Sequence, residues 1–449
     1  MKKLISIPAM VMALNSANAN DISTIYQQAA SNDAEIAAAR ATREANQYDL
    51  MIARGDLLPQ LAASYSYTQY SGKAEGSNLM AVAAGQATDL QTSDVDVDYS
   101  LGSLQISASQ ALLNLNAWYT YQAAKTGDEA YQVQLQLAEQ QLLLRVAEAY
   151  FNVLRAEENL ATAEAAEKAV KRSLEQTRQR YDVGLIAITE VHEAQASYDL
   201  SYVNLIDTQS AVDISYEALE QLTGQRYDRL SSLDEGIILQ MPEPQDASAW
   251  VETGLGKYTG VRLAEIQREA VRQQRNATRS NHLPTVTLNA AYVNGENAPT
   301  FTPDPTESSV TTVGIQVSMP LLAGGSLYGQ SKKAAKNYAA ADFQLEQQKR
   351  TVKTSIRTQY RQLETIVKNI AARKQAITSA ESALEATKAG YDVGTRNIVE
   401  VLNAQNSLFS AQSNYANARY DYVLSLLNLK FYAGTLNEAD LNALNDWLI

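Results

Sequence analysis

Residues 180–200 read RYDVGLIAITEVHEAQASYDL, and this stretch decides the fold because the chain carries it twice. Residues 390–410 read GYDVGTRNIVEVLNAQNSLFS. At this offset, 181–224 and 391–434 agree at 14 of 44 positions without a gap. Chance does not produce such agreement, so the chain contains two copies of one unit.

Apolar residues recur every seven positions ahead of each Tyr-Asp-Val-Gly stretch. The grid comprises Val146, Val153, Leu160, Leu174 and Tyr181 in the first copy, and Ile356, Leu363, Ile370, Ile377, Leu384 and Tyr391 in the second. This spacing is typical of helices that pack as coiled coils. No proline interrupts 116–180 or 329–390. At 1.5 Å per residue, each helix would be about 95 Å long.

Each copy is therefore predicted to contain a long helical hairpin, over about 116–224 and about 329–431, that turns at Tyr-Asp-Val-Gly. Gly184 and Gly394 can adopt positive φ and end a helix, and the missing Cβ allows another chain to approach closely. A role as helix caps alone would also explain both glycines.

Ahead of each hairpin the apolar period changes to two, over about 60–113 and about 284–322. Strands of about ten residues with one apolar face fit an outer-membrane barrel, although a soluble sheet is the alternative. Four strands cannot close a barrel, since the smallest transmembrane barrels have about eight. Two or three copies would have to share one barrel.

The polar stretches 71–100 and 294–309 separate the strands of each pair and are expected to be rim loops. The first contains Asp94, Asp96 and Asp98. We interpret these acids as part of a solvated loop, with a calcium site as the alternative.

The N-terminus indicates export. Lys2 and Lys3 precede an apolar run from Leu4 to Leu14 and the small residues up to Ala19, which predicts a signal peptide at 1–19. An uncleaved anchor is the alternative. No later stretch approaches the roughly 18 consecutive apolar residues of a transmembrane helix.

Composition excludes several classes of function. The chain has no cysteine, which excludes disulfides and thiolate metal sites. A formal charge of −13 disfavours nucleic acid as a partner. His192 and His282 lack ligand spacing and are interpreted as surface or interface residues, so no metal is expected. No nucleophile elbow, phosphate loop or paired acids in a pocket-forming context appear, so neither an enzyme nor a cofactor is predicted.

The order of these features resembles the TolC family of outer-membrane channel-tunnels. The resemblance covers nearly the whole mature chain, through DISTIYQQAASNDAEIAAARA, LLPQLAASYSY, both YDVG tips and GTLNEADLNAL. It implies an α+β homotrimer with four strands per protomer and twelve in one barrel, continued by a coiled-coil tunnel. Repeat 1 would span 20–224 and repeat 2 would span 257–434. The segments 225–256 and 435–449 would form an equatorial band.

The resemblance also implies a passive exit duct in the outer membrane, in contact with outer-membrane lipid. A periplasmic adaptor and an inner-membrane transporter of the RND, ABC or MFS type would recruit it for multidrug efflux and type I protein secretion. A soluble periplasmic coiled-coil adaptor is the alternative, but adaptors have one hairpin per chain.

Family resemblance further implies a gate at the tips. Tyr391 and Arg396 would tie the second hairpin to Thr189 and Glu190 of the first hairpin and to the adjacent protomer. The alternative is that Arg396 and Glu190 are solvated surface residues.

Two further roles follow from the same resemblance. Glu400 would form a ring of acids inside the constriction, with a solvated helix face as the alternative. Asn403 stands at the second ring position, where the family has an acid, so one ring is expected and tight divalent-cation block is in doubt. The candidate contacts for the adaptor are Val183, Gly184, Leu185, Val393, Gly394 and Thr395.

Overall fold

The computed structural model describes residues 21–77, 88–89, 92–234, 236–297 and 306–449. The predicted signal peptide lies outside the described residues.

The chain divides into two compact units, each assembled from both repeats. Unit 1 comprises 1–43, 131–265 and 344–449, and unit 2 comprises 44–130 and 266–343.

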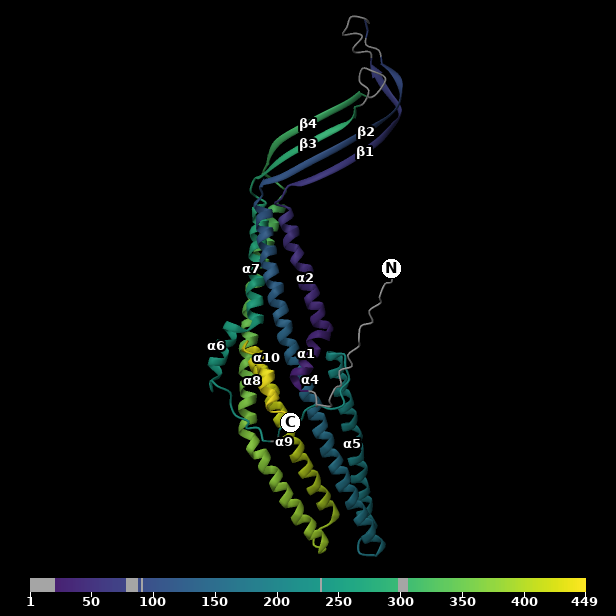
Figure 1. Cartoon of the computed structure of the whole chain (residues 1–449), viewed down its shortest axis with the longest axis vertical. Coiled ribbons are helices and arrows are strands. Elements are labelled where there is room, and N and C mark those ends of the chain that lie inside the picture. The colour runs from purple at the N-terminus through teal and green to yellow at the C-terminus, as the bar shows by residue number, and fades with distance from the viewer. Residues whose placement is uncertain (1–20, 78–87, 90–91, 235, 298–305) are drawn as a thin grey trace, which may run out of the picture. The chain divides into compact units, whose positions relative to one another are not determined.

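Unit 2 holds one antiparallel sheet in the order β1-β2-β3-β4 (Figure 1). β1 (Gln60–Ser77) pairs with β2 (Thr92–Leu113), and β3 (Thr285–Asn297) pairs with both β2 and β4 (Thr306–Ser318). The strand pairs of the two repeats therefore join directly. Within the described chain, the outer edges of β1 and β4 have no partner strand.

The register collects apolar side chains on one face of the sheet. Leu61 pairs with Ala108, Ala108 with Ala290, and Ala290 with Val313, so one row crosses all four strands. Leu61 is 76% exposed and Val313 is 72% exposed. The described chain thus leaves this apolar face uncovered.

The strands continue into the stretches that we expected to be rim loops, so that expectation is wrong for their strand-forming parts. Asp94, Asp96 and Asp98 lie within β2. The rings of Tyr70 and Tyr99 stack across β1 and β2 with centroids 5.2 Å apart. The physical reason is visible in the sequence, because apolar residues alternate with these three acids at the strand period.

A helix precedes each strand pair. α1 (Ile22–Asn32) and α2 (Ala34–Gly55) lead to β1, and α7 (Thr259–Ser280) leads to β3. Asp21 caps α1 by accepting a hydrogen bond from the Thr24 amide at 2.7 Å.

Two long hairpins follow the strand pairs. α4 (Leu115–Asp182) and α5 (Ile188–Thr223) form the first, and α8 (Ser326–Asp392) and α9 (Ile398–Tyr432) form the second. Figure 1 shows α5 beside the lower half of α4 and α9 beside the lower half of α8. Among the described residues, no helix has both the length and the apolar character needed to span a bilayer.

Short elements connect to the hairpins within unit 1. α6 (Ala247–Lys257) follows the first hairpin and α10 (Glu438–Asn445) follows the second. Leu233 and Leu448 form an isolated antiparallel bridge. The segments after the two hairpins therefore meet each other.

Unit 1 contains two separate apolar clusters. The main core includes α1, α4, α9 and α10, and buries the grid residues Val146, Val153, Ile356 and Leu363. The second, which we call the tip cluster, consists of Val170, Leu174, Ala194, Leu384, Tyr391, Ile398, Val401, Leu402 and Leu408. Most of the predicted heptad residues therefore contribute to one of the two clusters.

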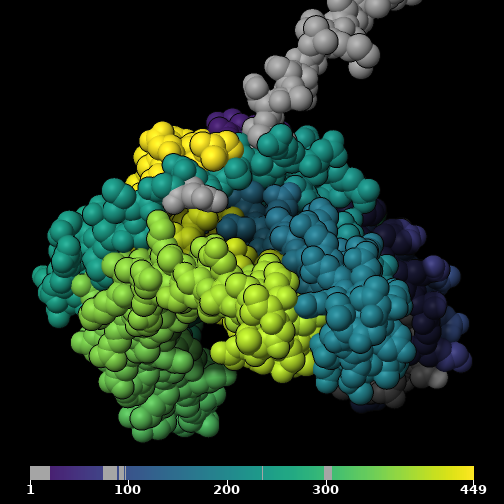
Figure 2. Space-filling model, turned by 90° about the horizontal axis from the view of Figure 1, so that it is seen from below, coloured from purple at the N-terminus to yellow at the C-terminus, as the bar shows by residue number. Residues whose placement is uncertain are grey.

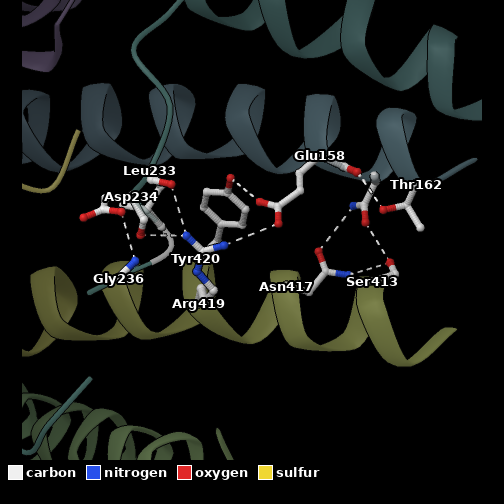
Figure 3. A network of polar contacts seen from close by, with 10 residues as sticks. Glu158, Thr162, Leu233, Asp234, Gly236, Ser413, Asn417, Arg419 and Tyr420 are labelled. Carbon is white, nitrogen blue, oxygen red and sulfur yellow. Dashed lines mark hydrogen bonds and ion pairs between the residues drawn. The ribbon is translucent and has the colours of Figure 1, made fainter. Parts of the chain in front are cut away.

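Polar contacts occupy the stretch between these clusters. Asn159 of α4 accepts a hydrogen bond from Ser413 at 2.7 Å and donates to Asn417 at 3.3 Å (Figure 3). A cavity of about 540 Å³ lies beside them, lined largely by Asn, Ser and Thr side chains of α4, α5 and α9. The packing between the hairpins is therefore apolar at its two ends and polar in the middle.

A buried polar network ties α9 to α4 and to the segment after α5 (Figure 3). Arg419 is 4% exposed and donates to the carbonyls of Leu233 at 3.1 Å and Asp234 at 2.9 Å. Its ion pair with Glu158 measures 3.4 Å. The Tyr420 hydroxyl donates to the same carboxylate at 2.6 Å. Burial, and then the hydrogen bond to Glu158, raise the pKa of Tyr420, which keeps this hydroxyl a donor.

Arg419→Met should lower the free energy of unfolding by about 3 kcal/mol, because the buried Leu233 carbonyl and the partly buried Asp234 carbonyl lose their donor and the half-buried Glu158 carboxylate loses its ion pair. Arg155→Met is the matched control. Arg155 pairs with Asp421 at 2.8 Å, but both side chains are partly exposed, so its loss should cost under about 1 kcal/mol. Thermal unfolding at equal protein concentration compares them. Equal losses would contradict the importance of the network.

Candidate functional site

The tips of the two hairpins have the same backbone geometry. Gly184 has φ 78° and Gly394 has φ 80°, as the sequence predicts for helix-ending glycines. The Leu185 amide donates to the Arg180 carbonyl at 2.9 Å, and the Thr395 amide donates to the Gly390 carbonyl at 2.9 Å. The duplication is therefore preserved at the level of individual hydrogen bonds.

The residues predicted to meet an adaptor are exposed. Val183 is 71% exposed, Leu185 69% and Val393 76%, while Gly184, Gly394 and Thr395 are also exposed. Their own chain covers only a small part of these apolar side chains. Their adaptor contacts stay a prediction.

The two tip tyrosines differ in burial. Tyr181 is 41% exposed, whereas Tyr391 is 6% exposed and belongs to the tip cluster. The Tyr391 hydroxyl lies 3.5 Å from the hydroxyl of Thr177, which is fully buried. The second tip is therefore seated against α4 of the first hairpin. Figure 2, seen from below, shows the second hairpin in yellow-green against the first in blue.

Arg180 of α4 holds the same tyrosine from another side. Its guanidinium carbon lies 4.4 Å from the centre of the Tyr391 ring. Its nitrogens donate to the carbonyl of Tyr391 at 3.0 Å and to that of Asp392 at 3.3 Å. One side chain of the first hairpin thus contacts both the aromatic ring and the last carbonyls of α8.

The predicted latch residues do not all meet within one chain. Tyr391 contacts Thr177 and Arg180, while Arg396 forms an ion pair with Glu400. The structure brings neither Thr189 nor Glu190 to Tyr391 or Arg396 within this chain. Contacts of these residues with a neighbouring protomer stay a prediction.

Glu400 has a defined position at the start of α9. Asn397 accepts a hydrogen bond from the Glu400 amide at 3.0 Å, and Glu400 accepts one from the Asn397 amide at 3.4 Å, which forms a capping box. The hydrogen bond from Arg396 lowers the pKa of Glu400, and the Asn397 amide adds to this effect. Asn403 lies exposed one turn further on.

Sequence reasoning missed Thr177 and Arg180, although each left a signal. Thr177 is a polar residue at a seam position of the heptad, seven residues after Val170. Arg180 stands where the second copy has Gly390, so the two tip strings differ at their first letter.

None of these tip residues forms a metal-binding cluster. Among the described residues, no group of three or more His, Asp or Glu side chains has an arrangement that could hold a metal ion.

Solved structures share this fold. The Campylobacter jejuni CmeC outer membrane channel superposes with a TM-score of 0.77 at 17% identity, over 95% of this chain and 89% of that chain. A four-stranded sheet continued by two long helical hairpins is therefore the fold of an outer-membrane channel.

The chain belongs to the outer membrane efflux protein family, whose profile matches residues 25–225 and 259–435. It is 35% identical to outer membrane protein TolC of Vibrio cholerae, over 99% of this chain and 98% of that protein. It is also 27% identical to proteases secretion protein PrtF of Dickeya chrysanthemi, over 100% of this chain and 96% of that protein. The predicted family, fold class and outer-membrane location are confirmed.

Gly394→Ala should destabilise the second tip by about 1 kcal/mol, because a side chain disfavours φ 80°. Amide hydrogen exchange of Thr395 and Arg396 should quicken about fivefold. Gly127→Ala is the control, since Gly127 lies inside α4 and an added Cβ would meet no atom within 4 Å. That change should stabilise the helix. Unchanged exchange at the second tip would contradict the need for glycine at this φ.

Proposed function

We propose that the chain is one protomer of a homotrimeric outer-membrane duct for efflux and type I protein secretion. The observation that carries the proposal is the sheet, which among the described residues has two unpaired edges and an uncovered apolar face, and whose strands lead into helical hairpins. In lipid, every backbone donor and acceptor needs a partner, so an open sheet must be completed by other copies. Three copies would supply the twelve strands that the family resemblance implies.

An exposed apolar stripe on α5 supports association between protomers. Leu200, Val203, Ile206 and Ile214 lie on this helix, and each is about half exposed or more. Their spacing of three, three and eight residues follows one helix face. Burying such a stripe against a neighbouring protomer would build a tunnel wall from hairpins.

The proposed domain organisation follows the duplication. Repeat 1 spans 20–224 and repeat 2 spans 257–434. Segments 225–256 and 435–449 form the equatorial band, in agreement with the bridge between Leu233 and Leu448.

The gate is proposed at the hairpin tips. Tyr391 and Arg396 hold the second hairpin, with Thr189 and Glu190 of the first tip as partners between chains. Charge-assisted hydrogen bonds contribute roughly 1.5 to 3 kcal/mol each, so a few of them can bias a gate that must still open. The polar stretch between the two apolar clusters supports this proposal, because it separates the tip contacts from the main core.

Glu400 is proposed to line the constriction as a ring of three carboxylates, one from each protomer. Its lowered pKa keeps the side chain charged, and a ring of negative charge favours cations. Asn403 supplies no second charge.

The proposed partners are a periplasmic adaptor and an inner-membrane transporter of the RND, ABC or MFS type. The duct has no energy source of its own in this proposal, and the transporter supplies it. The adaptor would contact the exposed tip residues, whose apolar side chains are otherwise solvated. The comparisons support both uses, since the family is named for efflux and one relative is named for secretion of proteases. A soluble adaptor is disfavoured by the family match.

The purified protein should form channels of low conductance in planar bilayers, and Tyr391→Phe combined with Arg396→Ser should raise the conductance several-fold. The reason is that both changes remove tip hydrogen bonds while leaving the sheet intact. Absence of conductance in both proteins would refute the duct. Equal conductances would retain the duct and reject the gate residues.

Cation selectivity should fall as the pH drops through the lowered pKa of Glu400, below the ordinary value of 4.5. A lowered pKa means that the charged form persists above this point and disappears beneath it. Arg396→Gln removes the main cause, so the midpoint should move upward. Reversal potentials in a salt gradient measure both midpoints.

Lys368→Gln provides the control for this titration, because it breaks another exposed pair four residues apart, with Glu364. Its midpoint should match that of the wild type. A midpoint that is unchanged in Arg396→Gln would remove Glu400 from the selectivity filter.

A further inference from the structure

The two copies of the tip differ at the residue that precedes Tyr-Asp-Val-Gly. The first copy has Arg180 and the second has Gly390, although three backbone hydrogen bonds recur in both tips. An arginine at position 390 would meet its own tip, because even a Cβ there would lie 2.7 Å from the Cγ of Arg396. The cation is therefore available from the first hairpin only.

Arg180 contacts the second hairpin at three points. The guanidinium stacks on the Tyr391 ring at 4.4 Å, and it donates to the carbonyls of Tyr391 and Asp392 at 3.0 and 3.3 Å. These carbonyls belong to the last turn of α8, which ends at Asp392. A cation is favoured there because the final carbonyls of a helix have no partner in the helix and carry its negative dipole end.

The planar guanidinium suits this position better than an ammonium group would. It can stack on a ring while its edge donates in a forked arrangement to two oxygens. The ammonium group of lysine is compact and not planar. It could still be attracted to the carbonyls, but it could not stack on the ring and donate to two oxygens at once. The contact therefore depends on shape as well as charge.

We propose that Arg180 is the intrachain latch that holds the second hairpin tip against the first hairpin, and that opening the duct requires its release from Tyr391. This inference rests on the proposed function, because it assigns a further positioning residue to the same gate. It places the first restraint inside each protomer. Arg396, which pairs with Glu400 inside its own chain, is then left for contacts between protomers.

The burial of Tyr391 makes the latch cooperative with the tip cluster. The ring is 6% exposed and is held on one side by Arg180 and near its hydroxyl by Thr177. Movement of the α8–α9 tip away from α4 would break the stacking and both hydrogen bonds together. The equivalent Tyr181 has no such role, since it is 41% exposed.

The test compares the single-channel conductance of wild type, Arg180→Gln and Arg180→Lys with that of the matched control Arg178→Gln. Arg178 lies two residues away on α4 and donates to Gln195 within its own hairpin. Its substitution by Gln removes the same charge as Arg180→Gln. Arg180→Gln should raise the conductance several-fold, Arg180→Lys should raise it less, and Arg178→Gln should leave it at the wild-type value.

A distance measurement gives a second readout that a general loss of stability would not mimic. The chain has no cysteine, so Val183→Cys and Val393→Cys place spin labels only on the two exposed tips. Arg180→Gln in this background should shift the distance distribution toward longer values, whereas Arg178→Gln should not. Thermal unfolding checks that both variants remain folded.

Several results would overturn the latch. An Arg180→Gln channel with wild-type conductance and wild-type tip distances would do so, and so would an equal effect of Arg178→Gln. If the Tyr391→Phe and Arg396→Ser double variant opens while Arg180→Gln does not, the gate stands and this latch fails. If no variant and no wild-type protein conducts, the proposed duct itself fails.

Discussion

The seam between α4 and α9 is the interaction on which unit 1 depends, because it joins the hairpin of one repeat to that of the other. At one end it is buried in the main core, where Val146 and Val153 pack beside residues of α9. At the other end it is buried in the tip cluster, with Val170 and Leu174. Between them, Asn159, Ser413 and Asn417 interact through hydrogen bonds. When two helices separate, water can replace the partners of their hydrogen bonds, so separation costs less free energy there than where apolar side chains pack. The helices can therefore separate in this middle stretch more easily than at its two ends.

The position of Arg419 shows how the seam is fixed at the edge of the main core. A buried guanidinium costs a large desolvation energy unless its donors find acceptors. Two backbone carbonyls and the Glu158 carboxylate provide these acceptors. The segment after α5 is consequently held against α9, and this contact fixes the position of the segment at the edge of the main core. The tip cluster has no comparable buried ion pair among the described residues, which fits the movement that we propose for the gate.

Duplication supplied two equal tips, and divergence gave their tyrosines different surroundings. Both retain the glycine with positive φ and the acid that starts the following helix, Glu190 and Glu400. They differ in the partner of the tyrosine, since Tyr391 is buried and Tyr181 is not. Each difference lies in a side chain while the backbone stays the same. Two tips with the same backbone can therefore form a contact in which each contributes a different side chain.

Most of the architecture could be predicted from periodicity. A seven-residue spacing without proline specified helices of 68 and 67 residues, and a spacing of two specified the strands. The same rule, applied further, would have placed Asp94, Asp96 and Asp98 in β2, but their charge suggested a loop. Charge is a weak guide in a strand whose face is solvated, because solvent accepts acids there at little cost.

The sequence by itself determined the duplication, the hairpins, the tip glycines and the family, since these depend on residues close together in the chain or on repeated letters. Only the tertiary structure decided which side chains meet between the repeats. Arg180 and Tyr391 are 211 positions apart in the chain, and nothing local requires them to touch. Their contact exists because packing the heptad seam brings the end of α4 beside the end of α8, and pairing across such a separation is set by the relative register of the helices rather than by local preference.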